Sequence, residues 1–251
     1  MHNEPTTESP GAISAQRFRF LKQFNSEELA HKIRSRDRVI PQDARLFPGD
    51  QLYAAFARSL CSHRAIPFKE VLESFEFFAC VRKRIRSRNM ADLCCGHGLV
   101  GVLFAICERA VENVVLLDKV RPPSFDRVQA ATAEVAPWAI QKLSYVRSSL
   151  RDAKRFLEPG TGIVGVHACG TRTDQCIDHA LDAGGAIAVL PCCHRHRHES
   201  PECLKRELGA DVAIDVDRTY RLANAGYQTR WDHIPESITQ KNRVLIGLPG
   251  Q

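Results

Sequence analysis

The chain has 251 residues, a formal net charge of +6 at pH 7 and a hydrophobic share of 44%. That apolar share excludes wholesale disorder, and the longest apolar stretch, at residues 99–107, is too short to cross a membrane. Because the first residues lack the basic-then-apolar pattern of a signal peptide, we expect a cytoplasmic protein with no membrane partner, in which the ten cysteines are not joined in a disulfide framework.

The first 66 residues are predicted to form a tail and a helical extension. Residues 1–13 are polar, contain Pro5 and Pro10, and are predicted to be disordered. In residues 14–66, apolar side chains recur at spacings of three to five between positions 18 and 33, which predicts helix within residues 14–40. A second helix is expected at 51–63.

The positive charge is concentrated before residue 91. Residues 1–90 contain 16 Lys and Arg against 10 Asp and Glu, whereas residues 91–251 contain 19 of each kind. A basic face beside a neutral domain favours a polyanionic partner such as RNA. A solvated helical surface explains the same excess equally well.

From residue 67 to residue 251 the pattern predicts one α/β domain. After a helix at 68–86, strands are expected at 90–94, 113–117, 143–147, 163–167 and 186–190, separated by helices at 99–110, 125–142, 151–157 and 173–183. Helices at 201–208 and 213–225 precede two strands, 228–233 and 243–248, which have no helix between them and should pair antiparallel. Alternating strands and helices predict a doubly wound, seven-stranded, mostly parallel sheet.

A glycine-rich turn after the first strand is the first candidate site. Asp92 lies near the end of the strand, and Gly96, Gly98 and Gly101 follow it. Glycine lacks Cβ and tolerates positive φ, so the backbone of such a turn can lie against a ligand. Asp118 lies at the end of the second strand, where a carboxylate can accept hydrogen bonds from both hydroxyls of a ribose. The pattern predicts a site for a nucleoside cofactor, either NAD or S-adenosylmethionine.

Cysteine and histidine side chains follow the fourth and fifth strands. His167 and Cys169 follow the fourth, and Cys192, Cys193 and His194 follow the fifth. Since ligands bind beyond the carboxyl ends of parallel strands, we expect these five side chains to meet at one rim.

Three interpretations of this rim remain open. His167 or His194 could orient or deprotonate a substrate, or the cysteines could be small buried packing groups. The third interpretation is a metal site made by Cys169, Cys193 and His194, although no C-x-x-C spacing is present. A cysteine nucleophile acting on a pyrimidine ring is a minor fourth.

These motifs resemble those of a known enzyme family. Asp92-Leu93-Cys94-Cys95-Gly96-His97-Gly98 resembles the first motif of the class I S-adenosylmethionine-dependent methyltransferases, and the terminal strand pair is also typical of them. A subgroup that includes tRNA 2′-O-methyltransferases is similar in Val166-His167-Ala168-Cys169-Gly170 with Thr173-Asp174, in Pro191-Cys192-Cys193-His194 and in Lys241-Asn242-Arg243. The resemblance covers residues 67–250.

The resemblance implies a role for each matched position. Asp92, Gly96 and Gly98 would line the methionine part of S-adenosylmethionine, Asp118 would hold the ribose, and Ser149 or its neighbour would lie near the adenine. His167 and Cys169 would stand where such enzymes place the methyl acceptor, and with His194 they are the catalytic candidates.

The leading hypothesis is therefore a methyltransferase that uses S-adenosylmethionine and acts on RNA, either tRNA or rRNA. A small-molecule or protein acceptor is the alternative within the same enzyme class. A non-catalytic nucleotide-binding or metal-binding module is the alternative from a different class.

Overall fold

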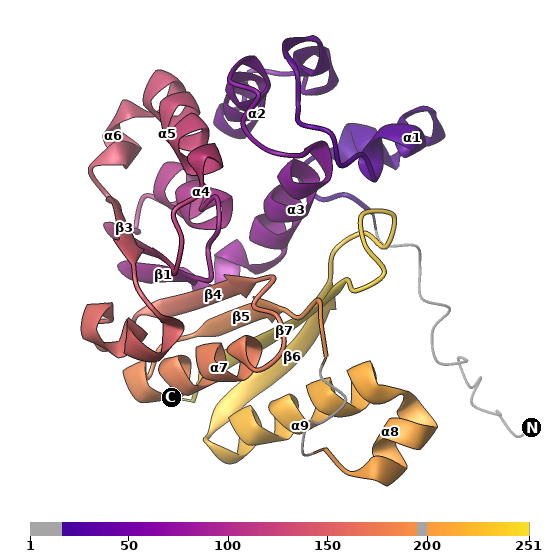
Figure 1. Ribbon diagram of the computed structural model, residues 1–251, viewed down its shortest axis with the longest axis vertical. Coiled ribbons are helices and arrows are strands. Elements are labelled where there is room, and N and C mark those ends of the chain that lie inside the picture. Colours follow the sequence, from indigo (N-terminus) through magenta and orange to yellow (C-terminus); the bar gives the residue numbers. More distant parts are fainter. Residues whose placement is uncertain (1–16, 195–199, 251) are drawn as a thin grey trace, which may run out of the picture.

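The computed structural model describes residues 17–194 and 200–250, and its centre is one seven-stranded sheet (Figure 1). The strands are β1 (Asn89–Leu93), β2 (Asn113–Asp118), β3 (Leu143–Arg147), β4 (Gly162–Val166), β5 (Ile187–Leu190), β6 (Tyr227–His233) and β7 (Arg243–Pro249). Their order is β3-β2-β1-β4-β5-β7-β6. The first five strands pair in parallel, and β7 runs antiparallel to both β5 and β6. The predicted mostly parallel sheet and the antiparallel terminal pair are both confirmed.

Helices cover both faces of the sheet. One face carries α2 (Leu52–Ser62), α3 (Phe68–Ile85), α4 (Leu99–Cys107), α5 (Pro123–Val135) and α6 (Pro137–Ile140); the other carries the 3-10 helix η4 (Leu150–Phe156), α7 (Arg172–Ala183), α8 (Glu202–Leu208) and α9 (Ala210–Asn224). The strands inside the sheet are largely buried, as a sheet between two helical layers requires, whereas the two edge strands, β3 and β6, are more exposed. No helix in the described part of the chain is both long and apolar enough to span a bilayer.

The predicted helix within residues 14–40 is wrong over most of its length. The segment instead forms two 3-10 turns, η1 (Lys22–Asn25) and η2 (Glu27–Leu29), a single α-turn, α1 (Ala30–Ile33), and then η3 (Pro41–Leu46). At the start of the segment, the cause is a buried carboxylate on α3. Glu76, 1% exposed, accepts hydrogen bonds from the backbone N–H groups of Arg19, Phe20 and Leu21 at 2.6–3.0 Å. A side chain from α3 thus takes the donors that a helix would have used.

The segments before residue 67 share a hydrophobic core with the sheet. Phe24 packs against Phe47 and Phe68, and Phe78 of α3 contacts Phe104 of α4 edge to face with 4.9 Å between ring centroids. The predicted tail at 1–13 lies outside the described residues.

The predicted helix at 125–142 is interrupted. It divides into α5 and α6 at Ala136, whose φ of −141° is not helical. The next residue is Pro137, and a proline ring disfavours helical backbone in the residue before it. The break does not disturb the sheet, since β3 still pairs with β2 along its length.

Candidate active site

The turn from β1 into α4 adopts the left-handed backbone that its glycines permit. Gly96 has φ 51° and Gly98 has φ 70°. Cys94 is also left-handed, at φ 59°, a conformation that costs energy for a residue with Cβ. A Cβ at Gly96 would meet no atom within 4 Å, whereas one at Gly98 would lie 3.1 Å from Leu116. Gly96 therefore faces open space, and Gly98 is needed for packing.

Two carboxylates accept hydrogen bonds from the backbone of this turn and of the helix that follows it. Asp92 accepts a hydrogen bond from the backbone N–H of Gly101 at 3.0 Å, and Asp118 accepts one from Gly96 at 2.9 Å. Burial raises the pKa of Asp92 to about 7; the hydrogen bond from Gly101 opposes this shift, and the charge of Asp118 adds to it. The predicted placement of Asp118 beside the glycine turn is thus found in the structure.

A cavity of about 570 Å³ lies beyond the carboxyl ends of β1 and β4. Four of the predicted site residues line it: Asp92, Gly96, His167 and Cys169. The other four, Gly98, Asp118, Ser149 and His194, do not. Asp118 is the last residue of β2, and Ser149 follows β3. Ser149 is exposed, and its hydroxyl accepts a hydrogen bond from the N–H of Arg151 at the start of η4. The cavity therefore corresponds to the methionine and acceptor side of the predicted site.

Helix α3 supplies a wall of this cavity that sequence reasoning missed. Lys69, Glu70, Glu73 and Ser74 all line it. The Nε2 atom of His167 lies 2.8 Å from Oε2 of Glu73, whose side chain is 2% exposed, while 42% of the His167 side chain is exposed. The backbone of His167 has φ 61°, so His167 is, after Cys94, the second residue other than glycine at this site with a left-handed backbone. A buried carboxylate thus fixes the accessible imidazole of His167 at the cavity, on a residue whose backbone is left-handed.

The charge of Glu73 changes the acidity of His167. Burial lowers the pKa of His167, but the hydrogen bond and the negative charge of Glu73 outweigh burial, so the pKa lies above its usual value. Lys69, 3.8 Å from the same carboxylate oxygen, works against this rise.

A second histidine–glutamate pair, His97 and Glu70, lines the same cavity. Nδ1 of His97 accepts a hydrogen bond from the N–H of Leu99 at 3.2 Å, so the ring proton resides on Nε2, which lies 3.2 Å from Glu70. This hydrogen bond keeps the pKa of Glu70 below its usual value. His97 therefore joins the glycine turn to α3.

The expectation that His194 meets the other rim residues is wrong. Its side chain is 2% exposed, and its two ring nitrogens lie 3.1 Å from Asp211 and 3.0 Å from Asp215, both on α9. Asp215 in turn pairs with Arg218 and Arg243. His194 thus contacts a buried network of charged side chains that is centred on Asp215 and reaches Arg243 at the start of β7. The basic residues 195–198 that follow it lie outside the described residues.

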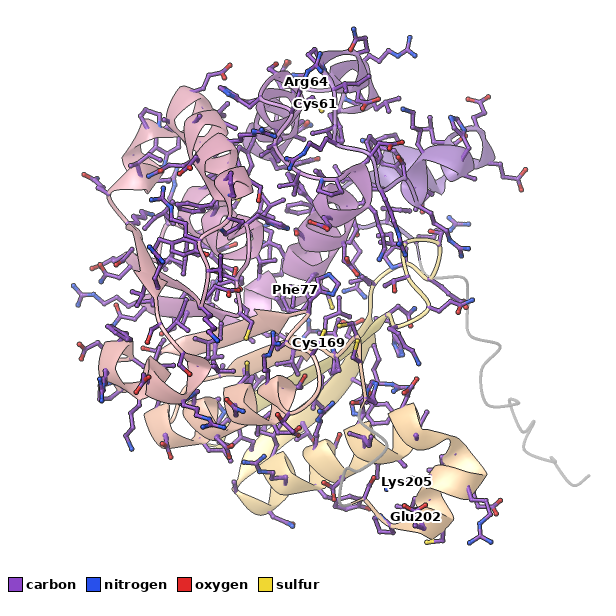
Figure 2. The ribbon with its side chains drawn as sticks, viewed as in Figure 1. Cys61, Arg64, Phe77, Cys169, Glu202 and Lys205 are labelled. Carbon is purple, nitrogen blue, oxygen red and sulfur yellow. The ribbon has the colours of Figure 1, made fainter. Side chains whose placement is uncertain are left out.

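The cysteines at the rim do come together. The Sγ atoms of Cys169 and Cys192 are 3.0 Å apart, those of Cys192 and Cys193 are 3.7 Å apart, and all three lie within 4.8 Å of one another. Figure 2 shows Cys169 between α3 on one face and α9 on the other. Cys169 and Cys192 both line the cavity.

A basic trough adjoins the cavity. We give this name to a second hollow of about 310 Å³ lined by Arg34, Arg36, Lys69, Ile238, Thr239, Gln240 and Lys241. It shares Arg36 and Lys69 with the main cavity. Arg34 donates to the carbonyl of Ser237 at 3.0 Å, and Lys241 pairs with Asp211. The Arg36 guanidinium makes no hydrogen bond or ion pair with any described residue.

Comparison with known proteins gives one family. The sequence model of a family described as methyltransferase domain matches residues 68–199. A Xenopus laevis protein named glutathione S-transferase C-terminal domain-containing protein is 31% identical over 201 residues, which are 64% of this chain and 31% of that protein. The chain thus spans about a third of the length of this curated relative.

Solved structures are more distant. A SAM-dependent methyltransferase from Aquifex aeolicus is 13% identical, with a TM-score of 0.43 and coverage of 70% of this chain and 91% of that one. The fibrillarin pre-rRNA processing protein of Methanococcus jannaschii is 13% identical, with a TM-score of 0.45 and coverage of 66% and 69%.

Proposed function

This chain belongs to the methyltransferase-domain family, and on that premise we propose that it transfers a methyl group from S-adenosylmethionine to RNA, tRNA or rRNA. The observation that carries the proposal is the cavity between the glycine turn and the His167–Glu73 pair. One wall is an open glycine backbone suited to a cofactor, and the other is a positioned imidazole suited to an acceptor.

The residues present fit the cofactor. The open space at Gly96 is a cradle that any side chain would partly fill, and Asp118 holds the N–H of that same glycine. Asp92 and Gly96 would hold the methionine part, and Asp118 and Ser149 the ribose and adenine. When bound, S-adenosylmethionine supplies a methyl group that is already reactive toward a nucleophile.

The chain's own contribution to the chemistry is mainly positioning. Holding a donor and an acceptor in line can supply much of a rate enhancement. His167, fixed by Glu73, is placed to accept a proton from an acceptor hydroxyl or amine in the cavity. Cys169 lies on the same side and shapes the acceptor pocket.

The basic trough supports an RNA acceptor. It places Arg34, Arg36 and Lys69 beside the cavity, where phosphates of a polynucleotide would meet them while one nucleotide enters. The resemblance to tRNA 2′-O-methyltransferases points to the same substrate class. The domain division, a basic extension at 14–66 and a methyltransferase domain from 67, is part of this proposal.

The acceptor class is tested by methyl transfer into fractionated cell extract. With labelled S-adenosylmethionine, we expect label in RNA. Label in protein or in small molecules would replace the RNA proposal with the corresponding alternative. If the chain does not bind the cofactor and does not methylate any fraction, it is a non-catalytic module.

The cofactor site is tested by Asp118→Ala. We expect calorimetric affinity for S-adenosylmethionine to fall at least about tenfold, because a hydrogen bond to a charged group contributes roughly 1.5–3 kcal/mol. Asp126→Ala on α5, which removes an exposed carboxylate paired with Arg121, is the matched control and should bind normally. Unchanged affinity in a folded Asp118→Ala protein contradicts the ribose assignment.

A further inference from the structure

The thiols of Cys169, Cys192 and Cys193 form a cluster to which the proposed methyl transfer assigns no chemical step. Cys169 follows β4, and the other two follow β5, which pairs in parallel with β4. The N–H of Gly170 donates to the carbonyl of Cys193 at 3.1 Å, so the two loops are already aligned by a backbone hydrogen bond. Three sulfur atoms from two loops thus lie within 4.8 Å of one another.

We propose that these three thiols bind one zinc ion, or a similar soft divalent cation, as thiolates. Zinc takes four ligands in a tetrahedron with Zn–S bonds of about 2.3 Å, which puts its sulfurs about 3.8 Å apart. The 3.7 Å between Cys192 and Cys193 meets this spacing. The 3.0 Å between Cys169 and Cys192 requires their sulfurs to separate by about 0.8 Å. Side-chain rotation in these partly exposed loops can supply that movement.

This ligand set differs from the one that the sequence suggested. We exclude His194 from the ligand set, because its ring is 2% exposed and its Nε2 atom is hydrogen-bonded to Asp215 on α9 at 3.0 Å. Cys192 takes its place. The change replaces a mixed sulfur–nitrogen site with an all-sulfur site, which favours soft cations over magnesium or calcium.

The fourth coordination position opens toward the cavity. Cys169 and Cys192 both line the cavity, so a cation between them is reached from it. A zinc ion with three protein ligands and one exchangeable position is the arrangement of reactive sites, whereas structural sites use four protein ligands. A thiol, water or other donor in the cavity would complete the tetrahedron.

The charge balance of the site is simple. Three thiols and one Zn²⁺ ion give a tris-thiolate complex of net charge −1 and release three protons. No electron transfer is involved, and no oxidant is needed. Since protons compete with the metal, affinity should fall as pH falls.

The test is a Co²⁺ titration of the full chain, reduced with a phosphine and freed of metal by a chelator. We expect one equivalent to produce near-ultraviolet thiolate-to-cobalt absorption and the visible bands of tetrahedral cobalt, and Zn²⁺ to abolish both. Cys169→Ser, Cys192→Ser and Cys193→Ser should each weaken binding at least about tenfold. Cys193 is exposed, so its variant puts folding at least risk.

Cys203→Ser is the matched control. Cys203 is exposed on α8, and the labels of Glu202 and Lys205 in Figure 2 show that this helix lies well away from Cys169. Its replacement should leave the titration unchanged. Absence of thiolate bands in the reduced chain, or bands that persist when all three cluster cysteines are serine, overturns the proposal. The proposal is also overturned if Cys169 and Cys192 form a disulfide in air and the chain, once reduced again, binds no metal.

The metal proposal and the methyl-transfer proposal fail separately. The cobalt spectrum needs no cofactor or acceptor, and the Asp118→Ala calorimetry needs no metal.

Discussion

Two buried glutamates on α3 show why residue-level roles were hard to predict. Glu73 and Glu76 are 2% and 1% exposed and lie on the helix face that also carries the apolar core residues. Burying a carboxylate is costly unless it is paired, so each must have a partner distant in sequence. Glu76 pairs with backbone N–H groups near residue 20, and Glu73 pairs with His167. The sequence signal was an acidic residue within an apolar face; its partner could not be read from spacing.

At the glycine turn and the rim, residues on neighbouring strands could be placed from the sequence, whereas contacts with distant elements could not. The positions of the glycine turn and of Asp118 at the ends of the first two strands could be predicted from a common motif, whereas the hydrogen bond between Asp118 and Gly96 was not predicted. The clustering of the three cysteines followed from neighbouring strands in the same way. The orientation of His194 did not, because it depends on α9, whose placement no local pattern specifies.

The His167–Glu73 pair predicts a measurable pH dependence. Glu73 raises the pKa of His167 above its usual value, so His167 becomes a neutral base only at a correspondingly higher pH. Methyl transfer that uses this base should therefore increase as pH rises through that pKa. Glu73→Gln should lower the pKa of His167, because it removes the negative charge that raises it, and NMR titration of the ring protons, assigned with His167→Gln, measures this change directly.

Glu112→Gln is the control for this titration. It removes an exposed carboxylate that pairs with Arg88, away from the cavity, and should leave His167 unchanged. If Glu73→Gln leaves the His167 pKa in place or raises it, the proposed orientation by Glu73 is wrong.

At the scale of elements, alternation of strands and helices was sufficient to predict the sheet but not its complete order. The parallel strands, the crossover helices and the antiparallel pairing of β6 with β7 all followed from pattern. The insertion of β7 between β5 and β6 did not, because pairing partners are chosen by tertiary packing. A long-range contact also explains the start of the misassigned segment before residue 41, where Glu76 accepts hydrogen bonds from the backbone N–H groups of residues 19–21.

The packing of α4 on the sheet depends on Gly101. A Cβ at this position would lie 2.3 Å from Cδ2 of Leu116, a fully buried side chain of β2, and 3.1 Å from Asp92 and Val114. Gly101→Ala should therefore lower the free energy of unfolding by about 1–3 kcal/mol through overpacking. Chemical denaturation measures this loss.

A double variant separates this steric cause from a change in helix propensity. Leu116→Ala alone should cost about 2–5 kcal/mol. Because it removes the atom that clashes, the double variant should lose at least about 1 kcal/mol less than the sum of the two single losses. Simple additivity would show that the contact between α4 and β2 is not what Gly101 protects.

At the scale of the whole molecule, part of the excess positive charge lies on one surface beside the cavity. The sequence placed that excess before residue 91 but could not say which cations share a surface. In the fold, Arg34 and Arg36 from the N-terminal segments and Lys69 from α3 meet the β6–β7 connection to form the basic trough. Other cations of the same region are paired, such as Arg82 and Arg86 with Glu108. In the basic trough, by contrast, Arg34 and Arg36 form no ion pair with any described residue, so these two cations are the ones we expect to be available to a phosphate.

Neutralising the trough should weaken RNA binding in a salt-dependent way. Each phosphate contact adds about 0.7 to the slope of log affinity against log salt for a single strand. The double variant Arg34→Gln, Arg36→Gln should therefore reduce that slope by about 1–1.5 in gel-shift or anisotropy titrations with a tRNA. Lys83→Gln, which removes an exposed cation near the other end of α3, is the matched control and should reduce it by less. Equal losses in both would mean that RNA contacts the basic surface diffusely and not through the trough, and no binding at low salt would redirect the search to a protein or small-molecule acceptor.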